Sequence, residues 1–165
     1  MNDKRFRVIP INQTQDRSTF NCGSEPLDSY FQERLTQDIR RRVTACFIAR
    51  TNDDRIAGYY TLASASVFLG DLPEKFKKKL PRYPSVPVVR MGRLAVDQTY
   101  KGLGLGAALL ADALTRVVRS EIAAYALLVD AKDNTAADFY RHHGFIQTAR
   151  ELLTLFLPLA TAPVT

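Results

Sequence analysis

The stretch Arg93-Leu-Ala-Val-Asp-Gln-Thr-Tyr-Lys-Gly-Leu-Gly-Leu-Gly-Ala-Ala-Leu-Leu110 predicts a strand, a glycine-rich turn and a helix in immediate succession. Its alternate glycines, Gly102, Gly104 and Gly106, let the backbone turn tightly and bring its N–H groups close to a ligand. Those N–H groups stand at the start of a helix, where the dipole favours an anion such as a diphosphate. A tight turn without any ligand would use the same glycines, so both interpretations are open at this point.

Two other phosphate-binding patterns fit this stretch poorly. A P-loop requires Gly-Lys-Ser/Thr at its end, and here Ala107 and Ala108 follow the last glycine. The stretch Gly102–Ala107 formally fits the dinucleotide pattern G-x-G-x-x-A, but too little chain follows it for a two-halved dinucleotide sheet. An acidic residue at a strand end about 20 positions further on is also missing.

Outward from this stretch, the pattern of apolar residues predicts a mixed sheet with helices packed on it, in one domain covering residues 1–165. The expected strands are Arg7–Asn12, Arg42–Arg50, Ile56–Leu69, Val88–Asp97, Tyr125–Asp130, Phe145–Thr148 and Leu152–Leu157. The expected helices begin after Ser24, at Glu74 (to Leu80), at about Leu103 (to Ser120) and at Asn134 (to His143). In the first of these helices Leu27, Phe31, Leu35 and Ile39 recur every four residues, as on one buried face.

Composition narrows the class of protein. Residues 1–90 hold 16 basic and 10 acidic side chains, whereas residues 91–165 hold 7 of each, so the first half faces an anionic partner or is a solvated basic surface. Two cysteines without a CxxC or Cys/His partner predict neither a disulfide framework nor a metal site. The absence of a signal peptide and of a long apolar run predicts a cytoplasmic protein without a membrane span.

Two motifs together resemble those of the GNAT N-acetyltransferases. The family's acetyl-coenzyme A motif, Gln/Arg-x-x-Gly-x-Gly/Ala, would read Lys101–Gly106 here, with Lys in place of the usual Gln or Arg. The later stretch Asp130–Phe145, with its Asn, Ala, Phe-Tyr and Gly-Phe, looks like the family's second segment. The resemblance covers nearly the whole chain and implies the GNAT fold, a mixed α/β fold with acetyl-coenzyme A bound at the strand–turn–helix.

The resemblance can be narrowed to one subgroup. The stretches Phe20–Phe31, Gly58–Leu62 and Gly92–Asp97 look like the GNAT toxins of bacterial toxin–antitoxin pairs, which acetylate the α-amino group of aminoacyl-tRNA and stop translation. This similarity implies acetyl-coenzyme A as acetyl donor, a tRNA substrate, a small ribbon-helix-helix antitoxin and a homodimer. It leaves two alternatives: a GNAT enzyme for a small amine or a protein N-terminus, and an idle GNAT-like module that binds nucleic acid or a partner.

The resemblance also implies a role for particular residues. Backbone N–H groups of the strand end would bind the thioester carbonyl and pantetheine, the glycine turn would bind the diphosphate, and an amide side chain would contact the cofactor. These cofactor-binding candidates are Leu94, Ala95, Val96, Lys101, Gly102, Leu103, Gly104, Leu105, Gly106, Ala107 and Asn134. The side-chain amide of Asn134 could instead cap a helix, and it could also do both.

Tyr140 stands where GNAT enzymes commonly keep a tyrosine that protonates the leaving thiolate. The alternative is a core tyrosine packed beside Phe139. No general base is evident, and His142 and His143 are expected to be structural residues near a helix end.

The RNA surface is expected at two basic stretches, through phosphate contacts rather than base stacking, because aromatic residues are sparse among them. Its candidates are Arg34, Arg41, Lys75, Lys77, Lys78 and Lys79. Two solvated helix faces would explain the same charges.

Overall fold

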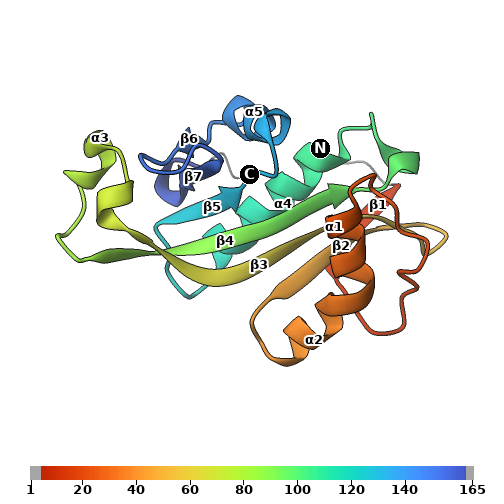
Figure 1. The fold of residues 1–165 in the computed structure, drawn as a ribbon. Helices are drawn as coiled ribbons and strands as arrows, with labels where there is room; N and C mark the ends of the chain where they lie inside the picture. The colour runs from red at the N-terminus through yellow and green to blue at the C-terminus, as the bar shows by residue number, and fades with distance from the viewer. Residues whose placement is uncertain (1–4, 163–165) are drawn as a thin grey trace. The chain divides into compact units, whose positions relative to one another are not determined.

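The computed structural model describes residues 5–162. Within this range the chain forms two compact units, one of residues 5–63 and 92–113 and the other of residues 64–91 and 114–162. We call them the first and the second unit. Seven strands are hydrogen-bonded in the order β1-β2-β3-β4-β5-β7-β6 (Figure 1). The pairing of β4 with β5 is parallel, whereas β1 with β2, β2 with β3, β5 with β7 and β6 with β7 pair antiparallel. The predicted mixed sheet is therefore confirmed.

In the first unit, an antiparallel run of strands packs against one helical segment. The strands are β1 (Phe6–Pro10), β2 (Ala45–Thr51) and the first part of β3 (Ile56–Phe68). β2 and β3 form an antiparallel hairpin, and Asp54 with φ of +64° lies in its turn. The unit also holds the end of β4 (Ser85–Val96), the 3₁₀ turn Gln98–Tyr100 and the start of α4 (Leu105–Arg119).

The helical segment of the first unit contains a wide turn that the sequence did not indicate. It comprises α1 (Glu25–Ser29), a π-helical turn (Tyr30–Arg34) in which Leu35 N–H donates to the Tyr30 carbonyl, and α2 (Leu35–Arg40). A strict repeat of four residues drifts around an ordinary α-helix, which has 3.6 residues per turn. The wide turn offsets this drift, so the four apolar residues of the predicted face all reach the same core: Leu27, Phe31, Leu35 and Ile39.

In the second unit, helices and a core of apolar side chains accompany the strands. The strands are the last part of β3, the first part of β4, β5 (Ala126–Asp130), β6 (Ile146–Gln147) and β7 (Thr154–Pro158). The helices are α3 (Glu74–Lys77), the end of α4 and α5 (Asn134–His142), and the 3₁₀ turns are Leu69–Asp71 and Leu159–Thr161. Gly144, with φ of +91°, ends α5 as predicted. The core of this unit includes Val67, Leu72, Val86, Val88 and Phe156.

Several predicted boundaries are wrong. The strand expected from Arg42 begins at Ala45, because Arg42 takes φ of +60° in the turn that follows α2. The strand expected from Val88 begins at Ser85 and so includes Pro87, whose carbonyl accepts the Tyr125 N–H at 2.8 Å. The helix expected to reach Leu80 ends at Lys77.

Candidate functional site: a strand–glycine turn–helix and a buried tyrosine

The glycine-rich turn has the geometry that the sequence predicted. Gly102 and Gly104 adopt φ of +81° and +78°, a left-handed conformation that residues with a Cβ rarely adopt. Ala108 N–H donates to the Gly104 carbonyl at 3.1 Å, which is the first turn of α4. The N–H groups of residues 105–107 therefore have no acceptor within the helix, and they form the anion-binding end that a diphosphate requires.

The strand end before this turn is packed closely against β3. A Cβ added to Gly58 would lie 2.8 Å from the carbonyl oxygen of Ala95, so the two backbones approach more closely than side chains would allow. Asp97 N–H donates to the Ala57 carbonyl at 2.8 Å. The predicted cofactor strand, Leu94–Val96, is thus held by its neighbour on β3 and by the buried Ala95 side chain.

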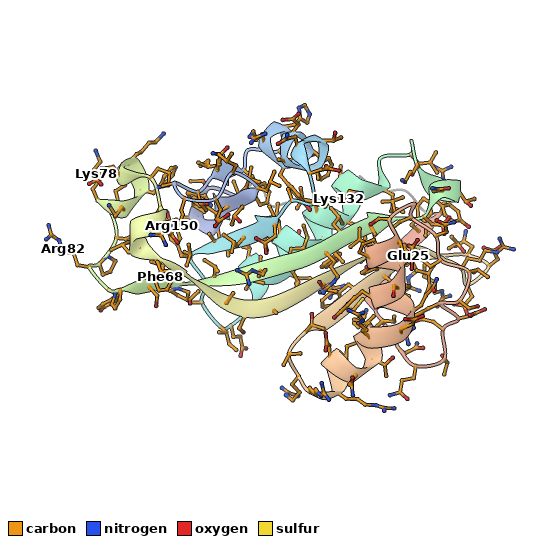
Figure 2. All side chains as sticks on the ribbon, viewed as in Figure 1. Glu25, Phe68, Lys78, Arg82, Lys132 and Arg150 are labelled. Atoms are coloured by element: carbon orange, nitrogen blue, oxygen red, sulfur yellow. The ribbon has the colours of Figure 1, made fainter. Side chains whose placement is uncertain are left out.

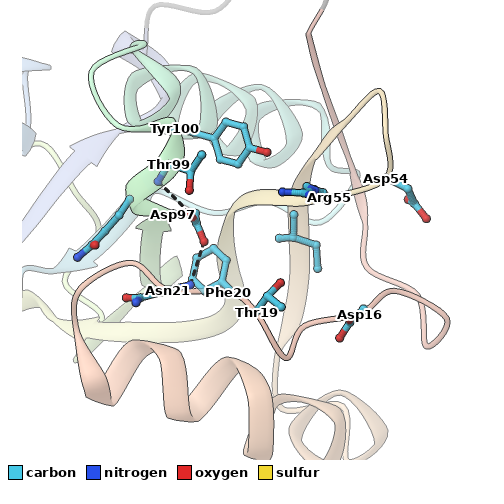
Figure 3. A pocket seen from close by; sticks show the side chains of 11 residues that line it. Asp16, Thr19, Phe20, Asn21, Asp54, Arg55, Asp97, Thr99 and Tyr100 are labelled. Atoms are coloured by element: carbon cyan, nitrogen blue, oxygen red, sulfur yellow. Dashed lines mark hydrogen bonds between the residues drawn. The ribbon is translucent and has the colours of Figure 1, made fainter.

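The side chain of Lys101, the first residue of the motif, is engaged by the loop that precedes α1. Its Nζ donates to the Cys22 carbonyl at 2.8 Å and so holds the loop that precedes α1. The buried carboxylate of Asp97 holds the same loop, because it accepts the N–H groups of Asn21 and Thr99, each at 2.9 Å (Figure 3). The sequence contained Asp97 in the motif but gave no sign of this role.

A pocket of about 450 Å³ lies beside Asp97 in the first unit (Figure 3). Asp16, Asp54 and Asp97 line it, together with Arg55 and several neutral residues. Three carboxylates around one hollow disfavour a diphosphate. None of the residues predicted to bind the cofactor lines this pocket.

Arg93 is a second residue whose role the sequence did not reveal. Its guanidinium carbon lies 3.3 Å from the centroid of the Tyr30 ring, and the Tyr30 hydroxyl donates to Asp38 at 2.7 Å. Burial, followed by this bond to Asp38, raises the pKa of Tyr30 to about 12. The contact joins β4 to the helical segment just before the predicted cofactor strand.

Asn134 is the first residue of α5 and is exposed. The residue that caps the helix is instead Asp133, whose carboxylate accepts the Ala136 N–H at 2.8 Å. The capping role considered for Asn134 is therefore wrong, and its amide is available for a ligand.

Tyr140 is buried, with 6% of its surface exposed, and lies between the rings of Phe139 and Phe145 at centroid distances of 5.3 and 5.5 Å. The packing that the core interpretation required is therefore present. Among the described residues, however, every fully enclosed side-chain oxygen has a hydrogen-bond partner. No hydrogen bond of the Tyr140 hydroxyl is observed within residues 5–162, so in this part of the chain its proton is not committed to another residue. Burial, and then Asp130, raises the pKa of this hydroxyl above its ordinary value and keeps it protonated.

The predicted RNA-binding residues divide between the units. Arg34 and Arg41 are exposed in the first unit, and Lys75, Lys78 and Lys79 are exposed in the second. Lys77 differs, because its Nζ lies 3.1 Å from a carboxylate oxygen of Glu74 and its charge is already partly neutralised.

Other titratable residues considered in the sequence lie against apolar side chains. Neither Cys22 nor Cys46 is in a disulfide, both are buried in one core cluster, and burial raises the pKa of the Cys46 thiol to about 12. The His143 ring packs edge-on against Phe139 at 4.8 Å. Over residues 5–162 there is no cluster of three or more His, Cys, Asp or Glu side chains that could hold a metal ion. In the same range no helix is both long and apolar enough to span a bilayer.

The fold and this strand–turn–helix define an acetyltransferase, and the comparison with known families agrees. The acetyltransferase (GNAT) domain family matches residues 17–154, and the chain belongs to this family, whose members take acetyl-coenzyme A as acetyl donor. A tRNA-acetylating toxin of Mycobacterium tuberculosis is 35% identical over 92% of this chain and 91% of its own length.

Two solved structures are similar as well. AtaT complexed with acetyl-methionyl-tRNAfMet has a TM-score of 0.88 and 30% identity, with 94% of this chain and 96% of that chain covered. A mutant of the toxin AtaT bound to acetyl-CoA and to the C-terminus of the antitoxin AtaR has a TM-score of 0.80 and 25% identity, with 95% of each chain covered.

Proposed function

We propose that this acetyltransferase is the toxin of a toxin–antitoxin pair, and that it acetylates the α-amino group of aminoacyl-tRNA and thereby blocks translation. The observation that carries the proposal is the match, over more than nine-tenths of the chain, to two proteins named for tRNA acetylation or solved with an acetylated aminoacyl-tRNA, at 92% and 94% coverage. The excess of basic residues in the first half of the sequence supports a polyanionic substrate.

The first unit would bind the acetyl donor mainly through its backbone. In this proposal Lys101–Ala107 bind the diphosphate through N–H groups at the start of α4, and the left-handed Gly102 and Gly104 leave room for it. The N–H groups of Leu94–Val96 bind the pantetheine and stabilise the oxyanion that develops on the thioester carbonyl. Asn134, which belongs to the second unit, would add its exposed side-chain amide.

The second unit would supply the acid. The neutral amine attacks the carbonyl carbon, the bond from that carbon to sulfur breaks, and the Tyr140 hydroxyl gives its proton to the departing thiolate. The raised pKa of Tyr140 keeps that proton in place at neutral pH. It also makes the transfer less favourable in energy, so we expect it to occur as the bond to sulfur breaks.

No side chain is needed as general base in this scheme. An α-amino group has a pKa well below that of a lysine, so an appreciable fraction is neutral near pH 7. The proton that the attacking nitrogen loses passes to water.

The tRNA would bind through its phosphates to Arg34, Arg41, Lys75, Lys78 and Lys79. Lys77 remains a candidate, but its ion pair with Glu74 would have to open first.

The proposal extends to partners and organisation. We expect a ribbon-helix-helix antitoxin, a homodimer and a cytoplasmic location, and the AtaT structure with its antitoxin supports a protein partner of this kind. We also expect both compact units to work as one acetyltransferase domain, because the family match spans residues from each of them.

The deciding experiment is mass spectrometry of charged tRNAs after incubation with the protein and acetyl-coenzyme A. The proposal requires a mass increase of one acetyl group on the aminoacyl moiety and none on uncharged tRNA. Acetylation only of small amines or of peptide N-termini would favour the alternative GNAT enzyme, and no acetylation of any amine would favour the idle module.

A further inference from the structure

Two large aromatic side chains of the second unit are left exposed at the ends of one connection. Phe68, the last residue of β3, is 65% exposed, and Tyr83, just before β4, is 67% exposed (Figure 2 labels Phe68). Leu69 N–H donates to the Pro84 carbonyl at 3.1 Å, so the two residues that follow these aromatics are hydrogen-bonded to each other. The connection thus begins and ends at one place.

Phe68 breaks the pattern of its strand. Ser64 and Ser66 are exposed, and Val67 is buried in the core of the second unit, so alternation places Phe68 on the solvent-facing side with the serines. A polar residue is expected there, because a phenyl ring on this side is covered by nothing in its own unit. The small serine side chains leave the face of the ring accessible.

The connection that bears these aromatics is anchored rather than loose. The ring of Phe76 packs edge-on against Phe156 at 5.2 Å, and Leu72 is almost fully buried in the same core. A hydrogen bond from Ala149 N–H to the Asp71 carbonyl at 2.7 Å ties it to the segment before β7. The exposed rings are therefore presented by a fixed segment, which reduces the entropy lost when a ligand binds.

The same connection carries an unbalanced positive charge. Its two acidic residues are already paired, Glu74 with Lys77 at 3.1 Å and Asp71 with Arg150 at 3.4 Å. Four cations of the connection have no carboxylate partner anywhere in the described chain: Lys75, Lys78, Lys79 and Arg82.

We propose that Phe68 and Tyr83 form a stacking platform for unpaired bases of the RNA substrate, with Lys75, Lys78, Lys79 and Arg82 binding the adjoining phosphates. Every base has a flat face that stacks on an aromatic ring, and cations beside such rings follow the backbone of a single strand. A protein partner fits this surface less well, because lysine is depleted at protein interfaces. The inference rests on the proposed function, since it assigns part of the tRNA contact to this connection, and it replaces the expectation of phosphate contacts alone.

The test uses the full-length protein and a single-stranded RNA oligonucleotide that carries one 2-aminopurine, whose fluorescence changes when the base stacks. The wild type should alter that fluorescence, and the double variant Phe68→Ala/Tyr83→Ala should not. Its affinity should fall by about five- to a hundred-fold, the range found when one stacking side chain is removed. Phe68→Tyr and Tyr83→Phe should behave as the wild type, because both keep an aromatic ring.

Leu152→Ala is the matched control, because Leu152 is also a large apolar residue of the second unit and is 71% exposed. It should leave both fluorescence and affinity unchanged. Equal melting temperatures would show that the alanine variants are folded. The same variants are to be tested with intact charged tRNA, and there too the double variant should bind more weakly.

Two results would overturn the platform. One is wild-type RNA affinity in the double alanine variant; the other is a dimer that becomes a monomer in that variant during sedimentation, since the rings would then be a contact between protein copies. Acetyl transfer by the wild type to aminoacyl-tRNA is measured separately. If the wild type acetylates aminoacyl-tRNA but the double alanine variant binds RNA as tightly as the wild type, the platform alone is refuted. If the wild type transfers no acetyl group, the proposed function is refuted.

Discussion

The two units of this acetyltransferase present different kinds of groups to a ligand. In the first unit the candidate groups belong to the backbone, at the turn formed by Gly102 and Gly104 and at the strand end Leu94–Val96. In the second unit they are side chains, the hydroxyl of Tyr140 and the amide of Asn134. The difference teaches which changes each unit tolerates: the first should be sensitive to backbone conformation, and the second to the loss of single functional atoms.

Tyr140→Phe should have the largest effect, because it removes one oxygen and keeps the packed ring. Turnover should fall by about 10²–10⁴-fold, the usual contribution of a general acid. Acetyl-coenzyme A affinity and melting temperature should change little. Single-turnover acetylation of a charged tRNA measures the effect.

Tyr125→Phe is the control for this change, since Tyr125 is a partly buried tyrosine of the second unit outside α5. It should keep full activity. Unchanged transfer by the Tyr140→Phe protein would remove the residue from the mechanism and leave the second unit without its proposed acid.

Reversing Lys75, Lys78 and Lys79 to Glu should weaken tRNA binding at least about ten-fold at low salt and make the negative slope of log K against log salt shallower by about 2 to 3. Acetyl-coenzyme A affinity should stay constant, because none of the three lysines is among the residues proposed to bind the cofactor. Filter binding at several salt concentrations measures both quantities. Lys132→Glu is the single-charge control. If the triple variant has the same slope as the wild type, the lysines of the connection are only solvated.

Gly104→Val tests the backbone half of the comparison. A branched residue at φ of +78° is strained by about 1–2 kcal/mol, which corresponds to roughly a five- to thirty-fold loss of acetyl-coenzyme A affinity if the turn opens to relieve it. Calorimetry measures the loss. Gly70→Val should be harmless to this affinity, because a Cβ there meets nothing within 4 Å. Binding by Gly104→Val as tight as in the wild type would place the diphosphate elsewhere.

The smallest effect concerns the start of α5. Asp133→Ala should lower the free energy of unfolding by about 1 kcal/mol, because it removes the N-cap. Asn134→Ala should leave that free energy unchanged and weaken acetyl-coenzyme A binding. Urea unfolding and calorimetry of the two variants separate the roles, and the opposite pattern would return the cap to Asn134.

The sequence predicted the order of elements and the mixed sheet because the main segments are long and strongly patterned. The strand–turn–helix around Gly102–Gly106 and the end of α5 at Gly144 were both correct for this reason. The residues at which single helices and strands end were harder to predict. Arg42 ends α2 in a left-handed conformation usually taken by glycine, and no residue type signalled it.

The contacts that the sequence did not reveal have a common physical origin, since they join partners far apart in the sequence. Lys101 donates to a carbonyl 79 positions away, and Asp97 accepts an N–H 76 positions away. The proximity of Phe68 and Tyr83 likewise depends on how the connection between them closes. Periodicity and motif spacing describe neighbours along the chain, so they could not reveal these contacts.

The wide turn at Tyr30–Arg34 has a consequence for the evolution of the family. A π-helical turn accommodates one more residue than an α-helical turn, so in effect it is a tolerated insertion. Removing one residue there would leave Phe31 and Leu35 three positions apart, which is still one face of an ordinary helix. Homologues should therefore differ in length by one residue at this turn while keeping both apolar anchors, and a one-residue deletion library across residues 32–34 should recover folded protein more often than one across β2.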